Sequence, residues 1–153
     1  YFLLNLPKAN QSYLYRVNSF NMMNYQEFVS DEYALIMLEH NFNGWILNKL
    51  PLLRKLKWRE AITFKAIYGG LSDRNDPDKH PEFIQFQNDE NGNRVNYTLE
   101  GKPYVETGFG IGNIMRAIRI DAIWRLTHLE NPDVPTMFNK KGFGLRFRFK
   151  VEF

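Results

Sequence analysis

The end of the chain, residues 142–153, alternates strictly between apolar and polar side chains, and this pattern constrains the fold more than any other feature. Successive side chains of a strand point to opposite faces, so an extended segment would have one apolar and one charged face. The apolar face would comprise Phe143, Leu145, Phe147, Phe149, Val151 and Phe153, and the other face Gly144, Arg146, Arg148, Lys150 and Glu152. A soluble sandwich strand turns its apolar face toward a protein core, whereas a membrane-barrel strand turns it toward lipid. The segment therefore predicts a strand and leaves its surroundings open.

Four further segments alternate in a similar way, namely residues 31–44, 59–70, 103–112 and 118–127. A helix is the alternative for residues 31–44, because the middle of that segment is apolar on both faces. Residues 1–30 have little periodicity, and we expect an ordered loop with strand fragments there. The sequence thus predicts an all-β chain with about five antiparallel strands.

The composition narrows the possible functions. Aromatic residues make up 16% of the chain, and they favour strands and membrane interfaces. No apolar run approaches the ~20 residues of a transmembrane helix, so any membrane embedding would have to use strands. The net charge of +3 is small and its cations are scattered, so we do not expect nucleic acid as a partner.

The sequence contains no convincing motif for a catalytic, cofactor-binding or metal-binding site. The chain has no cysteine, which excludes disulfides and thiolate metal sites. The three histidines lie in separate segments and are expected at the surface or at an interface. Residues 73–78 have only part of a calcium-loop pattern, and no nucleophile-elbow or dinucleotide motif occurs. We expect no catalytic residues, cofactor or metal, and therefore a protein that is not an enzyme.

The connections alternate in length, which is informative about membrane topology. Residues 71–102 and 128–141 are long polar loops, whereas residues 45–57 and 113–116 are compact turns. Outer-membrane barrels have long extracellular loops and short periplasmic turns. The layout therefore predicts an antiparallel transmembrane β-barrel in the cell outer membrane, with the apolar face toward lipid and the C-terminus in the periplasm.

The turn at residues 45–57 has a composition of its own. It combines leucines and a tryptophan with Lys49, Arg54, Lys55 and Lys57, and Pro51 suits the first position of a helix. This composition is typical of a segment at a membrane interface. A short surface helix packed on its own protein explains it equally well, so both interpretations stay open.

The charged faces of the strands supply the candidate site residues. We expect eight side chains to face a barrel lumen: Lys65, Glu106, Arg119, Asp121, Arg125, Arg146, Arg148 and Lys150. They would either line a conducting pathway or, more commonly, pair across neighbouring strands. Gly108, Gly110 and Gly112 share that face and leave room for a bend or a packed plug.

Several segments resemble a known family of Gram-negative outer-membrane proteins. They are residues 24–31 (NYQEFVSD), 38–44 (LEHNFNG), 50–57 (LPLLRKLK) and 68–73 (YGGLSD). Members of that family carry an N-terminal carboxypeptidase-like regulatory domain and a domain of unknown function that ends in a β-barrel. The resemblance implies that residues 1–153 are the C-terminal portion of one barrel domain, with residues 1–30 as a loop region.

More distantly, residues 104–112, 118–126 and 142–153 look like the last three strands of BamA and TamA barrels, which insert or translocate proteins. In that class the last strand carries an aromatic signal that the barrel-assembly machinery reads. The matching residues here are Gly142, Phe147, Phe149 and Phe153. The Arg-Gly motif of the lumen loop in that class has no counterpart in residues 10–30.

These observations predict a non-enzymatic outer-membrane barrel protein, BamA-like in protein assembly or translocation, or a component of a larger envelope complex. Its expected partners are outer-membrane lipid, the assembly machinery and other envelope proteins. Five strands are fewer than the ~8 that close a membrane barrel, so we expect a piece of a longer chain. The alternative is a soluble β-rich module that binds a ligand or a protein.

Overall fold

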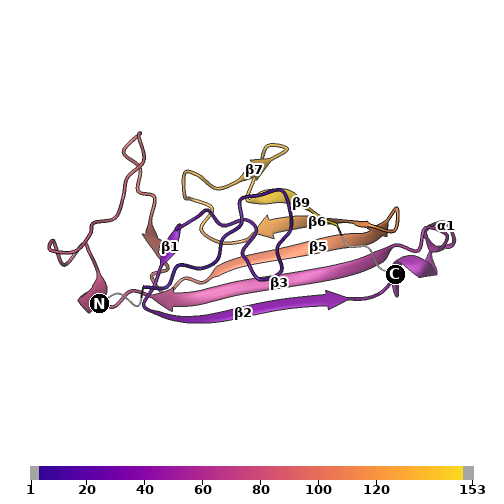
Figure 1. Ribbon diagram of the computed structural model, residues 1–153, viewed down its shortest axis with the longest axis horizontal. Helices are drawn as coiled ribbons and strands as arrows, with labels where there is room; N and C mark the ends of the chain where they lie inside the picture. Colours follow the sequence, from indigo (N-terminus) through magenta and orange to yellow (C-terminus); the bar gives the residue numbers. More distant parts are fainter. Residues whose placement is uncertain (1–3, 150–153) are drawn as a thin grey trace.

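The computed structural model describes residues 4–149, and its centre is a five-stranded antiparallel sheet (Figure 1). The strands are β2 (Glu32–Asn41), β3 (Arg59–Gly70), β5 (Tyr104–Ile114), β6 (Ile118–Arg125) and β9 (Phe143–Phe149). They are neighbours in the order β2-β3-β5-β6-β9, so each pairs with the next long strand along the chain. The five predicted strands are confirmed, and the helix alternative for residues 31–44 is wrong.

Shorter elements lie in the connections and in the N-terminal segment. They are β1 (Phe28–Val29), η1 (Leu47–Lys49), α1 (Pro51–Arg54), η2 (Asp73–Asn75), β4 (Tyr97–Thr98), β7 (Thr136–Met137) and β8 (Lys140–Lys141). Strand β1 pairs with β4 in parallel, and β7 with β8 in a small hairpin. Pro51 occupies the first turn of α1, where its missing N–H costs no helical hydrogen bond.

Strand β2 ends three residues before the predicted boundary because the backbone turns at Asn43 and Gly44. Both residues have a positive φ, 53° for Asn43 and 87° for Gly44. Asparagine and glycine adopt this left-handed region more readily than other residues, so the dipeptide stops the strand.

Successive connections between the long strands lie at opposite ends of the sheet (Figure 1). The link with α1, residues 42–58, and the turn between β5 and β6 are at one end. The links from β3 to β5 and from β6 to β9 are at the other. We call the first the α1 end and the second the loop end. The predicted alternation of connection lengths is only partly present, because the links 42–58 and 126–142 are equally long and the clear contrast is between the β5–β6 turn and the β3–β5 link.

The strand register gives the sheet two faces of opposite character. The inner face comprises Tyr33, Leu35, Met37, Glu39 and Asn41 of β2, Ala61, Thr63, Lys65 and Ile67 of β3, Tyr104, Glu106, Gly108 and Gly110 of β5, Arg119, Asp121, Ile123 and Arg125 of β6, and Gly144, Arg146 and Arg148 of β9. The outer face comprises Ala34, Ile36, Leu38 and His40, then Ile62, Phe64, Ala66 and Tyr68, then Val105, Thr107, Phe109 and Ile111, then Ile118, Ile120, Ala122 and Trp124, and finally Phe143, Leu145, Phe147 and Phe149.

The chain itself covers most of the inner face, although Tyr33 and Leu35 of β2 remain exposed there, whereas the outer face has no such cover. Residues 4–30 cross the inner face as a mostly irregular segment, which we call the N-terminal segment (indigo in Figure 1). Its Phe20, Met23 and Phe28 form the main apolar cluster with Ile67, Leu99 and Tyr104, all of them buried. On the outer face the large side chains of β3, β5, β6 and β9 are partly or fully exposed. The apolar side of the sheet therefore lacks a protein layer within residues 4–149.

The described strands do not close into a barrel, because β2 and β9 pair on one side only within the sheet. The N-terminal segment forms backbone hydrogen bonds with part of the free edge of β9. There, the Tyr15 N–H donates to the Phe147 carbonyl at 2.7 Å, and the Phe147 N–H donates to the Tyr13 carbonyl at 2.8 Å. None of the helices within residues 4–149 has the length and apolarity needed to cross a membrane.

Candidate functional site

Seven of the eight residues predicted to face a lumen lie together on the inner face of the sheet. They are Lys65, Glu106, Arg119, Asp121, Arg125, Arg146 and Arg148. Lys150 lies outside the described residues. The strict period of two in the sequence brings these charges to one side, and the N-terminal segment then buries most of them.

Glu106 and Lys65 bind the backbone of the N-terminal segment. The Glu106 carboxylate accepts the N–H groups of Asn21 and Met22 at 2.9–3.0 Å. The Lys65 ammonium donates to the carbonyls of Arg16 at 3.0 Å and Ser19 at 2.6 Å. The two charges also lie opposite each other on neighbouring strands, with Nζ and Oε1 3.8 Å apart. Together they supplement the hydrogen bonds that this irregular segment forms within itself, such as those of the Asn21 side-chain amide to the Arg16 and Ser19 carbonyls.

Arg125 forms a fully buried ion pair with Glu27 of the N-terminal segment. Its two terminal nitrogens lie 2.6 and 2.9 Å from the two carboxylate oxygens. Arg125 also donates to the carbonyls of Thr127 and His128 at 3.0 and 2.7 Å. Glu27 accepts in addition from the amide of Asn131 at 2.8 Å. This pair thus ties the N-terminal segment to β6 and to the loop that follows it.

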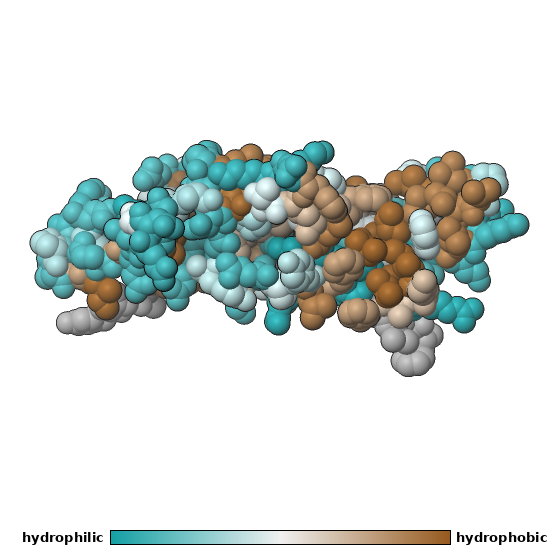
Figure 2. All heavy atoms as spheres, turned by 90° about the horizontal axis from the view of Figure 1, so that it is seen from above, coloured by the Kyte–Doolittle hydropathy of each residue, from teal (hydrophilic) through white to brown (hydrophobic). Residues whose placement is uncertain are grey.

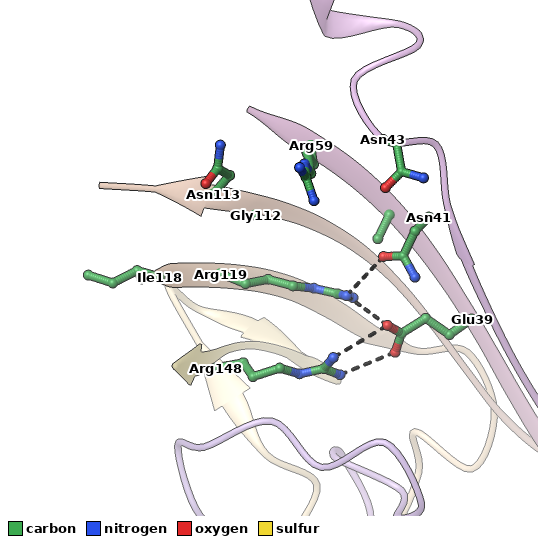
Figure 3. A pocket seen from close by; sticks show the side chains of 10 residues that line it. Glu39, Asn41, Asn43, Arg59, Gly112, Asn113, Ile118, Arg119 and Arg148 are labelled. Atoms are coloured by element: carbon green, nitrogen blue, oxygen red, sulfur yellow. Dashed lines mark hydrogen bonds and ion pairs between the residues drawn. The ribbon is translucent and has the colours of Figure 1, made fainter. Parts of the chain in front are cut away.

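A second charged cluster surrounds Glu39 near the α1 end (Figure 3). Arg119 donates to Glu39 Oε1 at 2.8 Å, and Arg148 donates to Glu39 Oε2 at 3.2 Å. Arg119 also donates to Asp121 Oδ1 at 2.6 Å. The phenol ring of Tyr15 lies beside these cations, with the Arg148 guanidinium carbon 4.4 Å from the ring centre. Burial and the nearby Glu39 carboxylate raise the pKa of Tyr15 above its ordinary value, so its hydroxyl stays protonated.

A polar cavity of about 260 Å³ adjoins this cluster. The side chains that Figure 3 draws around it come from β2, the turn after β2, β3, β5, β6 and β9. Its donors are the guanidinium groups of Arg59, Arg119 and Arg148 and the amides of Asn41 and Asn43. Planar guanidinium groups match carboxylate and phosphate oxygens, so the cavity suits a small anion, with Glu39 as an internal counter-ion.

Two glycines of β5 provide the space in which these side chains lie. A Cβ atom on Gly110 would clash with Asp121 Oδ1 and would lie 2.8 Å from Arg119 Nε. A Cβ on Gly108 would lie 2.6 Å from Thr63 Oγ1. The glycines on this face therefore make room for side chains of neighbouring strands, whereas the sequence predicted room for a bend or a packed plug.

Three of the four residues proposed as a C-terminal assembly signal, Gly142, Phe147 and Phe149, lie within the described residues. Phe147 and Phe149 lie on the outer face, and Phe149 is 69% exposed. Gly142 precedes β9 with a positive φ of 75°, and a Cβ there would lie 2.6 Å from Leu129 Cδ2, so its place in the fold demands glycine. Phe153 lies outside the described residues.

The histidines and acidic residues do not build a metal site in the described structure. No group of three or more His, Asp or Glu within residues 4–149 is placed to hold a metal ion. His128 is buried, which contradicts its expected place at a surface or an interface. Its ring packs on Phe28 with centroids 4.8 Å apart, and its Nε2 lies 3.0 Å from the Lys102 carbonyl. Burial lowers the pKa of His128, so the neutral ring is favoured there.

Sequence reasoning did not identify the partners of the inner-face charges. Glu39 lies in an alternating segment but was not among the predicted site residues, and Glu27, Tyr15 and Asn21 belong to a segment without periodicity. One signal was available: the seven inner-face residues contain five cations and two carboxylates. Buried cations need anionic partners, so two further carboxylates could have been sought among the remaining segments.

Comparison with known proteins covers part of the chain. Residues 6–74 match the model of the C-terminal domain of DUF5686, a family of unknown function. No curated protein and no solved structure is significantly similar to the chain. The matched residues run from the N-terminal segment to the link after β3, and therefore include Glu27, Glu39 and Lys65. The part of the candidate site that comes from the N-terminal segment, β2 and β3 therefore lies within the region similar to the C-terminal domain of that family of unknown function.

Proposed function

We propose that this chain forms part of the wall of an outer-membrane β-barrel, with the outer face toward lipid and the N-terminal segment inside the lumen. One observation carries the proposal. The apolar outer face is exposed, while the charged inner face is buried under the chain's own N-terminal segment. This is the reverse of the usual arrangement in a soluble sheet protein, and it is the arrangement of a barrel wall.

The energetics favour lipid as the neighbour of the outer face. Soluble proteins rarely expose contiguous apolar patches larger than a few hundred Å². Here four adjacent strands expose or half-expose aromatic and branched side chains, among them Phe64, Phe109, Trp124 and Phe149. Each Å² of such surface removed from water contributes about 25 cal/mol, so a lipid environment stabilises this face considerably.

The sheet edges favour a larger assembly. Unpaired backbone groups at a strand edge cost several kcal/mol each in hydrocarbon, so a five-stranded sheet cannot stand alone in a bilayer. We infer that further strands, from more of a longer polypeptide or from a neighbouring chain, continue the sheet beyond β2 and β9. The orientation follows the loop layout, with the α1 end and the C-terminus in the periplasm and the loop end outside the cell.

The proposed role is non-enzymatic. A barrel with a folded segment bound in its lumen suits outer-membrane protein assembly or translocation, as in BamA-like proteins, or a structural place in a larger envelope complex. Its partners would be outer-membrane lipid, the assembly machinery and other envelope proteins. The resemblance of the last strands to BamA-type barrels supports the first role, and the missing Arg-Gly motif in residues 10–30 favours the second.

Spin labels on adjacent residues of β3 test the proposal. The chain has no cysteine, so Phe64→Cys and Thr63→Cys each give one labelling site, on the outer and the inner face. In vesicles, the label at 64 should collide with lipid-soluble oxygen and not with a water-soluble nickel chelate. The label at 63 should be shielded from both reagents. Strong collision of the chelate with the label at 64, on protein that remains in the membrane fraction, would refute the lipid-facing assignment.

The second candidate is a soluble β-rich binding module, and the apolar cluster of Phe20, Phe28 and Tyr104 favours it, since this cluster is an ordinary protein core. In that case another protein would cover the outer face. This version predicts that the full-length protein stays in the aqueous fraction without detergent. Retention in membranes after alkaline carbonate washing would exclude it.

A further inference from the structure

The turn between β2 and β3, residues 45–57, combines exposed apolar side chains with basic ones. Leu52 is 85% exposed and Trp45 is 64% exposed, and Leu50 and Leu56 are each about half exposed. Neither η1 nor α1 has a buried residue. Leu47 and Leu53 are half-buried, so the turn packs on its own protein through these two leucines and leaves the others exposed.

The turn is held in place from its backbone side. The Ile46 N–H donates to Glu60 Oε1 at 2.6 Å, and the Phe42 N–H donates to the Glu60 carbonyl at 2.9 Å. The Asn113 side chain donates to the Lys57 carbonyl at 2.7 Å, which fastens the far end of the turn to the last residues of β5. These contacts fix the backbone against the sheet, while Leu50, Leu52 and Leu56 remain exposed.

The link at the α1 end carries positive charges only. Residues 42–59 contain five basic residues, Lys49, Arg54, Lys55, Lys57 and Arg59, and no acidic residue. The long connection at the loop end, residues 71–102, contains seven Asp and Glu residues against four Lys and Arg residues. The molecule is thus electrically polarised along its strands, with the positive pole at the α1 end.

Cations and apolar groups lie next to each other within the turn. The Lys49 ammonium lies 4.1 Å from the centre of the Trp45 ring, and this ring stacks on Phe42 at 6.4 Å. Figure 2 shows apolar surface gathered toward the α1 end and hydrophilic surface over the loop end. The apolar surface of the turn therefore adjoins that of the sheet, with basic groups at its margin.

We propose that residues 45–57 bind the phosphate head groups of anionic phospholipids in the leaflet that faces the α1 end. Trp45 and the leucines enter the boundary between head groups and acyl chains, and Lys49, Arg54, Lys55 and Lys57 contact phosphate oxygens. A purely apolar partner would leave four cations unpaired, and a purely acidic one would leave the leucines in water. A bilayer surface of negative charge satisfies both. The inference rests on the proposed function only for which leaflet is contacted.

Two variants with a single tryptophan separate this inference from the proposed function. The three tryptophans are Trp45, Trp58 and Trp124, and replacing two of them by phenylalanine leaves one emitter at a time. The protein is placed in vesicles whose phosphatidylcholine or phosphatidylglycerol carries bromine, which quenches nearby tryptophan. Trp124 reports whether β6 contacts lipid, and Trp45 reports whether the turn does.

The expected result is quenching of both, and for Trp45 it is stronger with brominated phosphatidylglycerol than with brominated phosphatidylcholine. Each basic residue near an anionic surface strengthens its attraction about fivefold at low salt. Changing Lys49, Arg54, Lys55 and Lys57 to glutamine should remove the preference for the anionic lipid. The matched control changes Arg74, Lys79, Lys140 and Lys141, on loop-end connections, and should leave the preference intact.

The outcomes are distinct. Quenching of Trp124 without Trp45 overturns the inference and leaves the proposed function standing. Quenching of Trp45 without Trp124 supports the inference and refutes the lipid-facing sheet. Equal quenching of Trp45 by both lipids, unchanged in the glutamine variant, also overturns the inference. Binding of an acidic protein to residues 45–57 in place of lipid overturns it as well.

Discussion

The buried ion pair of Arg125 and Glu27 gives the sharpest test of how the N-terminal segment is held. The side chain of Arg125 is 0% exposed and that of Glu27 is 2% exposed. Removing one partner of such a pair leaves the other as an uncompensated buried charge, which typically costs 3–5 kcal/mol. Arg125→Met is therefore expected to destabilise the folded state by about 4 kcal/mol, since Glu27 would keep only neutral donors from Asn24 and Asn131.

Glu27→Gln should cost less, about 2 kcal/mol, because Arg125 keeps its hydrogen bonds to the carbonyls of Thr127 and His128. In the double variant neither charge is left alone, so the two losses should not add. We expect the double variant to be more stable than the sum predicts by about 1–3 kcal/mol, the usual coupling of residues in contact.

The assay is urea unfolding of the four proteins in detergent micelles, followed by tryptophan emission, with hydrogen exchange to locate the change. Loss of the pair should speed exchange of the amides in the N-terminal segment more than exchange in the centre of β3. Additive free energies, or a loss below about 1 kcal/mol for Arg125→Met, would refute the reasoning. Either result would mean that the apolar cluster and the contacts of Glu106, Lys65 and Arg146 hold the segment without help from this ion pair.

Three further predictions concern single sites. Gly110→Ala should destabilise the protein by about 1–3 kcal/mol in the same assay because its Cβ would clash with Asp121. Gly112→Ala is the control and should change the stability little, since its Cβ would meet only ordinary contacts beyond 3.5 Å. Equal effects of the two substitutions would contradict this prediction. His128 has a pKa lowered from 6.5, so the unfolded state binds its proton more readily, and stability should fall as the pH drops below about 6.5. His128→Asn keeps a residue that tolerates the positive φ and should flatten the urea midpoint between pH 7 and 5; an unchanged slope would exclude this histidine as the cause. Glu106→Gln loses one of its acceptor oxygens, so hydrogen exchange at Asn21 should rise about tenfold, against an unchanged rate in the β7–β8 hairpin.

The strands and their faces could be predicted from the sequence because both depend on a local period of two. Alternation in residues 59–70 and 118–127 was sufficient to place Lys65 and Arg125 on one face. No longer-range information was needed for that assignment. The ends of the strands were less certain, since they depend on turns such as the one at Asn43 and Gly44.

The contacts of the N-terminal segment could not be predicted in the same way. Glu27 and Arg125 are 98 positions apart, and Asn21 and Glu106 are 85 positions apart. The segment has almost no regular structure, so no period marks which of its residues turn toward the sheet. Their partners follow from tertiary packing, which a local pattern does not encode.

The polarity of the sheet was also open from alternation alone, because a strand with one apolar and one charged face fits two environments. What favours one of them is the covering segment. Apart from its contact with the edge of β9, its irregular backbone does not join the hydrogen-bond ladder of the sheet, so Glu106, Lys65 and Arg146 bind its amides and carbonyls instead. Charged side chains on the inner face thus replace a missing layer of secondary structure. An apolar inner face could bury the same segment but would leave those backbone groups unpaired at about 1–3 kcal/mol each. The charged side chains on the inner face therefore allow an irregular segment, rather than a second sheet, to cover that face.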